Sequence, residues 1–159
     1  VTEGVVLADS DEHDEAGHIT ESAEVRKNMV DKRMKKTTKL INEELNEPMY
    51  IGESDIDYLV IGWGSTYGPL LEAKKLLNEE GIKTGLLSFS DVWPLPQTKL
   101  KKWSSSRAVE MIIVENNATA QLSRLISSET GIIIDKKVLK YDGRSFSVKE
   151  LYQKIKEVI

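Results

Sequence analysis

The sequence contains no cysteine, and this absence excludes several classes of chemistry at once. A chain without thiols forms no disulfide framework and offers no thiolate nucleophile. It also supplies no cysteine ligand to zinc or to an iron–sulfur cluster. The lack of cysteine is compatible with a reducing compartment, and we expect a cytoplasmic protein.

Long apolar runs and a signal-peptide pattern are missing as well. No stretch approaches the roughly 18 consecutive apolar residues of a membrane-spanning helix, and no signal peptide opens the chain. We therefore expect neither membrane insertion nor secretion. The 159 residues, 40% apolar and 30% charged, suffice for one globular domain or one domain with an extension. Because the chain begins with Val1, we expect it to be a fragment.

Charge is distributed unevenly near the start of the chain. Residues 1–24 contain acidic side chains but no Lys or Arg, whereas residues 26–39 are rich in both and contain Asp31 as their one acidic residue. A basic helix of this kind can bind nucleic acid, but no aromatic side chain lies among these cations to stack on bases. We expect a solvated helix face and no nucleic-acid partner.

The stretch HDEAGH, which begins at His13, suggests a metal site at first sight. In the zinc motif HExxH, two histidines four residues apart share one helical face. His13 and His18 are five apart, which places them roughly 140° from each other on a helix, and Gly17 disfavours helix. A loop that gathers Asp14 and Glu15 with both histidines around an ion is the alternative. We favour an acidic polar loop and predict no metal.

The first part of the chain is predicted to form a strand and a long helix. GVVLA at residues 4–8 is typical of a short strand, and Thr20 is the predicted cap of a helix that runs to about residue 45. Residues 47–54 contain a proline and a glycine and predict a boundary. The helix carries an apolar stripe that we expect to face inward, formed by Val30, Met34, Thr37, Ile41 and Leu45.

Strands and helices then alternate about every 25 residues, as expected for an α/β fold. YLVIGWGS at 58–65 is predicted to be a buried strand that runs into a glycine turn, and further strands are predicted at 83–89, 109–114 and 137–141. The fold class that follows is a three-layer, mostly parallel sheet with helices on both faces, preceded by the long helix. The first helix of this part is predicted to have an apolar face of Leu70, Ala73, Leu76 and Leu77 and to end at Gly81, and a short helix is predicted from Pro96 to Trp103. The next helix is predicted to have a face of Ala118, Leu122, Leu125 and Ile126 and to end at Gly131. In the last helix, Ser147 and Glu150 are predicted to form a capping box before the apolar residues Leu151, Ile155 and Val158.

GWGSTYG, which begins at Gly62, lies between a strand and a helix N-terminus, where a phosphate loop would lie. The dinucleotide fingerprint GxGxxG fails because Gly68 comes one residue too late, and the Walker pattern fails because it needs a lysine. We favour a structural turn in which Gly62 and Gly64 bend the chain and Ser65 or Thr66 caps the helix. Binding of an anion at this turn remains the alternative.

ENNATAQ follows the third predicted strand at its carboxyl end, where ligands of parallel sheets gather. Asn116, Asn117 and Gln121 are therefore candidates for contact with a ligand or partner. Alternatively, Asn117 caps the next helix and Asn116 turns the chain. Glu115 has neither a histidine nor a second carboxylate near it in sequence, so it lacks an acid–base partner. We predict no catalytic residue on this chain.

The three tryptophans, Trp63, Trp93 and Trp103, are numerous for a core of this size. Two of them follow predicted strands, so we expect some to be exposed at loop edges and at least one to pack in the core. Exposed tryptophans are typical of protein interfaces.

Five stretches together resemble one family. EHDEAGHITE at 12–21 is similar to the EHDExGxxTE signature in the α subunit of 2-oxoacid:ferredoxin oxidoreductases. VIGWGST at 60–66, LLSFSDVWPLP at 86–96, VENN at 114–117 and KYDGRSF at 140–146 resemble the final domain of that subunit in the same order. The resemblance covers nearly the whole chain.

This resemblance implies a division into three parts and a set of partners. Residues 1–19 would be the tail of a pyrimidine-binding domain, 20–54 a connecting helix and linker, and 55–159 a transketolase C-terminal-like domain. The intact enzyme uses thiamine diphosphate, Mg, an iron–sulfur cluster and CoA to decarboxylate a 2-oxoacid oxidatively and reduce ferredoxin. The cluster cysteines belong to the β subunit in this family, which agrees with their absence here.

Two hypotheses follow. In the first, the chain holds no cofactor, is inactive alone and serves assembly with the β subunit. Ferredoxin is then a partner of the whole complex, and a homo-oligomer of this chain is a further option. His13, Asp14 and Glu15 are its candidate contacts in the first segment. In the second, the chain is a stand-alone α/β domain that binds an anion such as a phosphate of CoA through Gly62–Thr66 and Asn116–Gln121.

Overall fold

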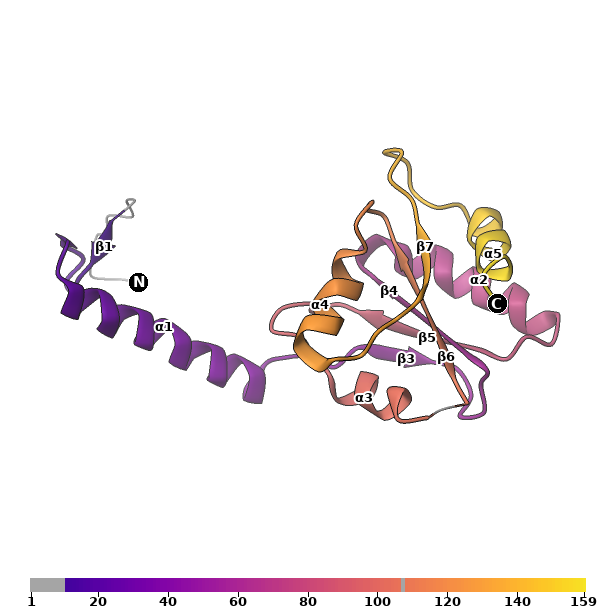
Figure 1. Ribbon diagram of the computed structural model, residues 1–159, viewed down its shortest axis with the longest axis horizontal. Coiled ribbons are helices and arrows are strands. Elements are labelled where there is room, and N and C mark those ends of the chain that lie inside the picture. Colours follow the sequence, from indigo (N-terminus) through magenta and orange to yellow (C-terminus); the bar gives the residue numbers. More distant parts are fainter. Residues whose placement is uncertain (1–10, 107) are drawn as a thin grey trace. The chain divides into compact units, whose positions relative to one another are not determined.

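The structure is a computed structural model that describes residues 11–106 and 108–159 (Figure 1). The chain divides into two compact units, Val1–Leu45 and Asn46–Ile159. The strand predicted at 4–8 lies outside the described residues. Among the described helices, none is long and apolar enough to cross a membrane.

In the first unit, HDEAGH forms the turn of a β-hairpin. Strand β1 (Glu12–His13) pairs in antiparallel fashion with β2 (Ile19–Thr20). Between them, one carboxylate oxygen of Asp14 accepts hydrogen bonds from the backbone nitrogens of Ala16 and His18, each at 2.9 Å. Gly17 adopts a φ of 88°, which only glycine reaches without strain. The turn is therefore closed by hydrogen bonds between the Asp14 carboxylate and backbone nitrogens of the same turn.

Helix α1 (Ala23–Glu43) follows the hairpin and starts at a different cap from the one predicted. Ser22 is the N-cap, and its hydroxyl accepts a hydrogen bond from the backbone nitrogen of Val25 at 3.4 Å. The assignment of Thr20 was wrong because Thr20 is paired with Glu12 in the hairpin, and its hydroxyl accepts from Ser22 N.

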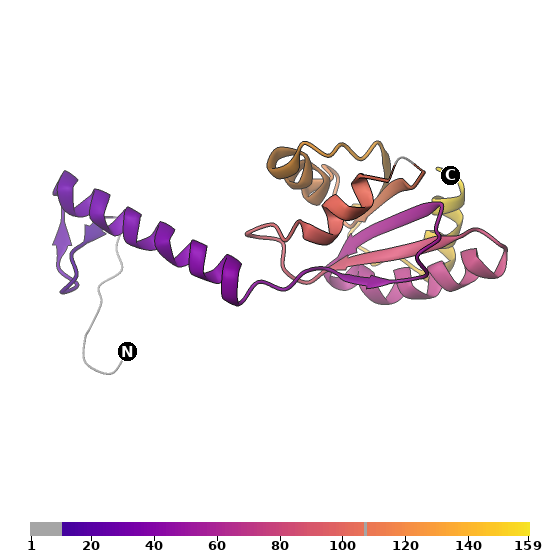
Figure 2. The same ribbon diagram turned by 90° about the horizontal axis from the view of Figure 1, so that it is seen from below.

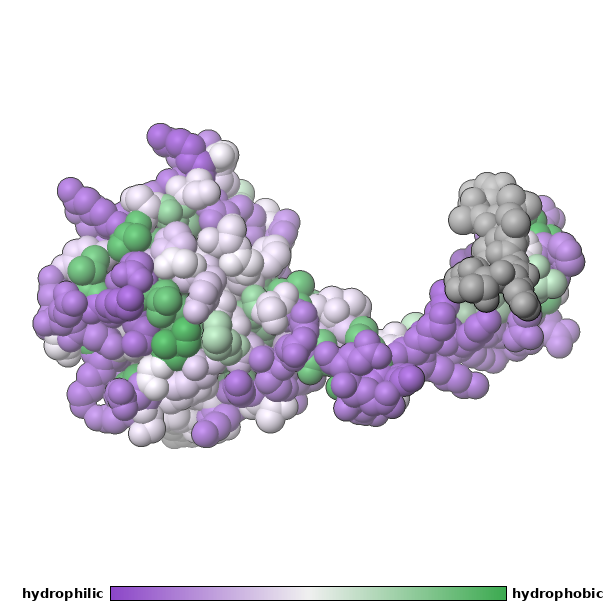
Figure 3. All heavy atoms as spheres, turned by 180° about the vertical axis from the view of Figure 1, so that it is seen from behind, coloured by the Kyte–Doolittle hydropathy of each residue, from purple (hydrophilic) through white to green (hydrophobic). Residues whose placement is uncertain are grey.

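The apolar stripe of α1 does not face inward within its own unit. The exposed fractions of Val30, Met34 and Ile41 are 37%, 60% and 48%, while Met29 is the buried residue of this helix. The prediction failed because, among the described residues of this unit, the hairpin packs on the side of α1 that carries Met29 and Arg33. That side is displaced by roughly 100° from the stripe. Figure 3 shows a face of α1 on which hydrophilic side chains predominate.

The second unit is built on a five-stranded sheet of order β3-β5-β4-β6-β7. The central pairs β4–β5, β4–β6 and β6–β7 are parallel, and β3 pairs with β5 in antiparallel fashion at one edge. The mostly parallel sheet of the sequence prediction is confirmed. The strands are β3 (Met49–Ile51), β4 (Tyr58–Trp63), β5 (Thr84–Phe89), β6 (Glu110–Glu115) and β7 (Lys136–Leu139).

Strand β3 lies within residues 47–54, which the sequence analysis assigned to a linker. Proline and glycine flank its three residues, and this composition hid a short edge strand whose pairing runs from Met49↔Ser88 to Ile51↔Leu86. Glu47, just before it, accepts hydrogen bonds from the backbone nitrogens of Thr98 and Lys99 at 3.2 and 3.1 Å. The segment therefore contributes both a strand and a helix cap to the second unit.

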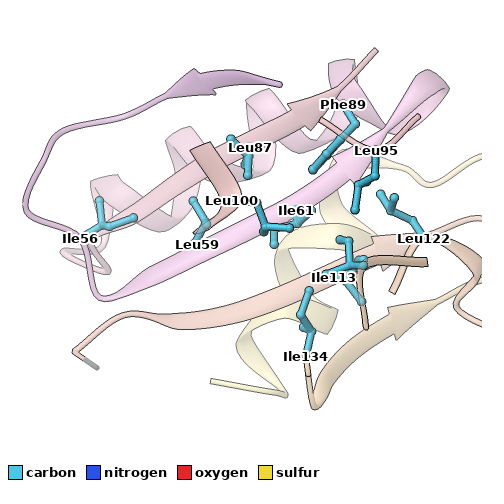
Figure 4. Packing of buried hydrophobic residues seen from close by; sticks show 11 residues of the cluster. Ile56, Leu59, Ile61, Leu87, Phe89, Leu95, Leu100, Ile113, Leu122 and Ile134 are labelled. Atoms are coloured by element: carbon cyan, nitrogen blue, oxygen red, sulfur yellow. The ribbon is translucent and has the colours of Figure 1, made fainter. Parts of the chain in front are cut away.

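Helices cover both faces of this sheet, as the view in Figure 2 makes clear. Alternate side chains of the strands point to opposite faces, so each face has a core of its own. Helices α2 (Tyr67–Glu79) and α5 (Val148–Lys156) pack on one core, which contains Val60 and Leu86. Helices α3 (Thr98–Ser104) and α4 (Gln121–Thr130) pack on the other, which contains Ile61 and Leu87 (Figure 4).

Several helix details differ from the sequence prediction, among them Ala118, which is exposed and lies before α4. Leu76 is 39% exposed, whereas Leu70, Ala73 and Leu77 are buried as predicted. Helix α3 begins at Thr98 and not at Pro96, because the capping carboxylate of Glu47 binds the backbone nitrogens of Thr98 and Lys99.

The start of α5 matches the sequence prediction in part. Ser147 is its N-cap, and the hydroxyl accepts a hydrogen bond from the backbone nitrogen of Glu150 at 3.2 Å. The carboxylate of Glu150 does not complete the capping box. It pairs with the ammonium group of Lys140 at 2.5 Å, because the loop after β7 brings that cation against the first turn of α5.

Candidate functional site

The candidate site lies at the carboxyl ends of the two neighbouring strands β4 and β6. After β4 the chain enters α2 on one face of the sheet, and after β6 it enters α4 on the opposite face. The loops therefore diverge between these two strands. In open α/β sheets such a switch point is where ligands bind.

The turn after β4 is shaped by packing. A Cβ added to Gly62 would lie 2.4 Å from Cδ1 of Leu70 and 2.7 Å from Oγ1 of Thr66. Glycine is therefore required so that α2 can approach the strand end. Thr66, in the 3-10 turn η1 (Gly64–Thr66), accepts from the backbone nitrogen of Trp63 at 3.0 Å and donates to its carbonyl at 2.8 Å. Gly64 has a φ of 56°.

Thr66, one of the two predicted residues, is the N-cap of α2, but its side chain makes no capping hydrogen bond to that helix. The hydroxyl of Thr66 instead ties the turn back to the strand end, and this leaves Ser65 exposed at the edge.

Glu115, the last residue of β6, is fully buried and caps helix α4 from outside the helix. Its two carboxylate oxygens accept hydrogen bonds from the backbone nitrogens of Leu122 at 2.9 Å and Ser123 at 3.0 Å. A carboxylate at a helix N-terminus satisfies free backbone donors and complements the helix dipole.

Two more donors reach the same carboxylate. The side-chain amide of Asn117 lies 2.7 Å away and the indole nitrogen of Trp63 lies 3.4 Å away. The general-base role considered for Glu115 is therefore unsupported, since both oxygens are engaged in structure. Sequence reasoning missed this cap because Glu115 lies 7 and 8 positions before the backbone nitrogens that it binds, outside the usual N-cap spacing.

The asparagines after β6 differ in exposure and in partners. Asn117 Oδ1 accepts from the backbone nitrogens of Thr119 at 3.1 Å and Gln121 at 3.3 Å, so this side chain shapes the loop before α4. Asn116 is exposed, and its amide donates to the carbonyl of Arg144 at 3.4 Å. Asn116 therefore connects the β6 edge with the loop after β7.

A hollow of about 400 Å³ opens at this edge. It brings together two of the candidates from sequence, Ser65 and Asn116. The other five candidates of the second unit are not among its lining residues; they are Gly62, Gly64, Thr66, Asn117 and Gln121. The lining consists of Ser65, Asn116, Lys140, Tyr141, Gly143, Arg144 and Ser145.

The two cations of this hollow are held by carboxylates. The ion pair with Lys140 lowers the pKa of the Glu150 carboxyl, and the hydrogen bond from Arg144 lowers the pKa of Asp142. The same pairing raises the pKa of the Arg144 guanidinium. Both cations are therefore positioned by carboxylate partners, Lys140 by Glu150 and Arg144 by Asp142.

The hairpin of the first unit contains a different polar cluster. His13 Nδ1 lies 2.8 Å from the carbonyl oxygen of Asp14, and His18 Nδ1 lies 3.3 Å from the Asp14 carboxylate. Glu15 is exposed. Within residues 11–106 and 108–159, no three His, Asp or Glu side chains gather where they could hold a metal ion.

Glu12 is the buried acid of the hairpin and joins it to α1. The Arg33 guanidinium reaches its two oxygens at 3.1 and 2.6 Å, and Arg26 lies 3.9 Å away. The hydrogen bonds from Arg33, helped by a bond from the backbone of His13, lower the pKa of Glu12 from 4.5 to about 2.

The tryptophans behave as the sequence analysis expected. Trp93 is 63% exposed in the loop after β5. Trp63 and Trp103 are half-buried and pack on the core between the sheet and helices α3 and α4. The ring of Trp103 lies 4.9 Å from that of Tyr50.

A family comparison gives the fold a place among known proteins. Residues 56–151 match the family model of pyruvate:ferredoxin oxidoreductase core domain II. The match covers all strands of the sheet except β3.

Curated relatives extend the similarity toward the start of the chain. The α subunit of 2-oxoacid:ferredoxin oxidoreductase 1 from Aeropyrum pernix is 34% identical over 153 residues, which are 94% of this chain and 24% of that protein. The α subunit from Saccharolobus solfataricus is 37% identical, with the same coverage. The chain thus spans about a quarter of the length of these relatives.

Solved structures agree. A 2-oxoglutarate:ferredoxin oxidoreductase from Magnetococcus marinus, solved with 2-oxoglutarate, coenzyme A and succinyl-CoA bound, has a TM-score of 0.76 and 27% identity. The match covers 96% of this chain and 26% of that chain. The α chain of a probable 2-oxoacid ferredoxin oxidoreductase from Thermoplasma acidophilum has a TM-score of 0.50 and 38% identity over 70% of this chain and 96% of that chain.

A transketolase from Pichia stipitis, at 19% identity and a TM-score of 0.53, shares the fold alone. The family match, the relatives and the shared sheet confirm the resemblance seen in the sequence. The chain belongs to the pyruvate:ferredoxin oxidoreductase core domain II family and is similar over nearly its whole length to the α subunits of 2-oxoacid:ferredoxin oxidoreductases.

Proposed function

We propose that this chain is the C-terminal part of the α subunit of a thiamine-diphosphate-dependent 2-oxoacid:ferredoxin oxidoreductase, which couples the CoA-dependent oxidative decarboxylation of a 2-oxoacid to the reduction of ferredoxin. Its own task is assembly with the β subunit. Thiamine diphosphate, Mg²⁺ and the iron–sulfur cluster are held elsewhere in the complex.

One observation carries the assembly role. The stripe of Val30, Met34 and Ile41 is exposed along α1, and the described residues 11–45 of its unit leave these side chains uncovered. Exposed apolar side chains at helical spacing are costly in water and mark contact surfaces. A partner that covers the stripe removes this cost.

The polar residues near the sheet edge support the same role. Glu115, Asn117 and Thr66 satisfy donors and acceptors of the domain itself and leave no pair of groups arranged for proton transfer. Trp93 offers a further exposed aromatic side chain of the kind found at protein interfaces.

The experiment uses the whole α subunit that carries this chain, co-expressed with a tagged β subunit. The test variant replaces Met34 and Ile41 with Gln, which keeps length but removes apolar surface. The matched control replaces Lys35 and Lys39 with Gln on the opposite side of the same helix. Co-purification of the α subunit and CoA-dependent dye reduction with several 2-oxoacids are measured.

We expect the Met34→Gln, Ile41→Gln variant to lose most of its co-purification and activity, while the control retains both. Circular dichroism of each purified α subunit checks that it is folded. Equal co-purification of the two variants would contradict the assembly role. An intact pair that reduces dye with no 2-oxoacid would contradict the proposed enzyme.

A further inference from the structure

We propose that the hollow lined by Ser65, Asn116, Lys140 and Arg144 binds the phosphate group of a small organic phosphate, with an aromatic part of the ligand placed at Tyr141. This site is separate from the assembly role proposed for α1, and neither depends on the other.

The position of the hollow is the first support. Ser65 follows β4 and Asn116 follows β6, the two strands between which the loops diverge to opposite faces of the sheet. Such a crevice forms because adjacent loops leave in different directions, and it recurs as the ligand site of open α/β sheets. The third wall is the loop at 140–145 between β7 and α5.

The donors lining the hollow suit a phosphate. Lys140 has three N–H donors and directs them to Ser145 O at 3.1 Å and Glu150 at 2.5 Å, so one donor is left. Arg144 binds Asp142 through Nε and Nη2, which leaves both donors of Nη1 for a ligand. Ser65 and Asn116, both exposed, add a hydroxyl and an amide.

The carboxylates that pair with these cations do not line the hollow. Asp142 and Glu150 therefore hold Arg144 and Lys140 in place without being among the lining residues. A site whose donors are already positioned loses less conformational freedom when a ligand binds.

Size and surroundings favour an organic phosphate over the bare ion. A volume of about 400 Å³ is in the range of small-molecule pockets and larger than a phosphate ion requires. Tyr141 is 72% exposed and also lines a second hollow of about 380 Å³ that contains Lys137 and Lys154. An exposed aromatic ring between two groups of cations can stack on an aromatic base.

In the test, the 159-residue chain is titrated with adenosine 5′-monophosphate, inorganic phosphate, adenosine and CoA. Binding is measured by calorimetry and by changes in the NMR shifts of the backbone amides. The binding variants are Arg144→Met and Ser65→Ala. Arg124→Met, which removes an exposed arginine on α4 away from this hollow, is the matched control. Amide spectra of all variants verify an intact fold.

We expect saturable binding of adenosine 5′-monophosphate and CoA, with shifts at Ser65, Asn116 and Gly143. Inorganic phosphate should bind more weakly and adenosine weakest. Arg144→Met should weaken binding about tenfold, as the loss of one charged hydrogen bond predicts, while Arg124→Met leaves it unchanged.

Three results would overturn the proposal. They are the absence of saturable binding by any phosphate at concentrations up to about 10 mM, equal affinity for the nucleotide and for adenosine or bare phosphate, and equal losses in Arg144→Met and Arg124→Met. Co-purification with the β subunit is not affected by any of these results, so the proposed function stands or fails on its own experiment.

Discussion

The carboxylate of Glu115, at the end of β6, accepts a hydrogen bond from the backbone nitrogen of Leu122 in the first turn of α4 at 2.9 Å. Its other oxygen accepts from Ser123 N at 3.0 Å. A strand end and a helix start on opposite sides of a loop are thereby joined inside the protein. The edge that carries the candidate site depends on this connection.

Replacing Glu115 with Gln is expected to destabilise the second unit by about 1–3 kcal/mol. Glutamine has one acceptor oxygen, so one of the two backbone nitrogens at the start of α4 would face an NH₂ group and lose its partner. Urea unfolding followed by tryptophan fluorescence measures this, because all three tryptophans lie after residue 46. Glu129→Gln, on the exposed last turn of α4, is the control, and equal stability of the two variants would refute the cap.

Gly62→Ala is expected to destabilise the second unit by about 1–3 kcal/mol through overpacking. The new Cβ would lie 2.4 Å from a fully buried Leu70 side chain and 2.7 Å from the Thr66 hydroxyl. Gly68→Ala is the matched control, because nothing lies within 4 Å of its Cβ position. Thermal unfolding of both variants decides the matter: a stable Gly62→Ala protein would favour a ligand-related reason for this glycine.

Acid is expected to weaken the contact between hairpin and α1 only at low pH. The pKa of Glu12 is lowered to about 2 by Arg33, from an ordinary value of 4.5. The contribution of this ion pair to stability is therefore complete above pH 4.5 and disappears as the pH falls through about 2. Carbon-13 NMR of the Glu12 carboxyl group measures its titration directly.

Arg33→Met should return the titration of Glu12 toward the ordinary value, whereas Lys35→Met on the other side of α1 should not. A Glu12 midpoint near 4.5 in the unaltered chain would show that the pair does not form.

Ser147→Ala is expected to cost about 1 kcal/mol of stability through loss of the N-cap of α5. The Ser147 hydroxyl accepts from Glu150 N at 3.2 Å, and the loss leaves that nitrogen without its side-chain partner. Ser127→Ala, on the exposed side of α4, serves as the comparison in the same urea titration. A Ser147→Ala variant with an unchanged free energy of unfolding would mean that water caps the helix equally well.

The parallel sheet could be predicted because its signals are local. Apolar runs at β4, β5 and β6 and the caps and glycines between them are each readable within a few residues. Strand β3 was hidden because three residues between a proline and a glycine carry too little periodicity. It pairs with Leu86–Ser88 of β5, which follows α2 in the sequence, so the pairing partner is not local.

The candidate site was only half readable, for the same physical reason. Ser65 and Asn116 stood out because they follow strand ends, and the structure places both in one hollow. The cations Lys140 and Arg144 were not singled out, although KYDGRSF was a recognised stretch, because the sequence does not show that the loop after β7 returns to β4 and β6. The stripe on α1 was recognised, but its exposure depends on which elements of the unit contact the helix, a tertiary property.

The central claim is that this chain is an assembly element of a 2-oxoacid:ferredoxin oxidoreductase. The most direct measurement is the mass of the whole α subunit co-expressed with its β partner, with and without residues 23–159, which include α1, by light scattering alongside CoA-dependent dye reduction. The account predicts an active complex from the intact pair and separate, inactive subunits from the truncated one. A truncated pair that still forms the complex and turns over at the same rate would contradict it.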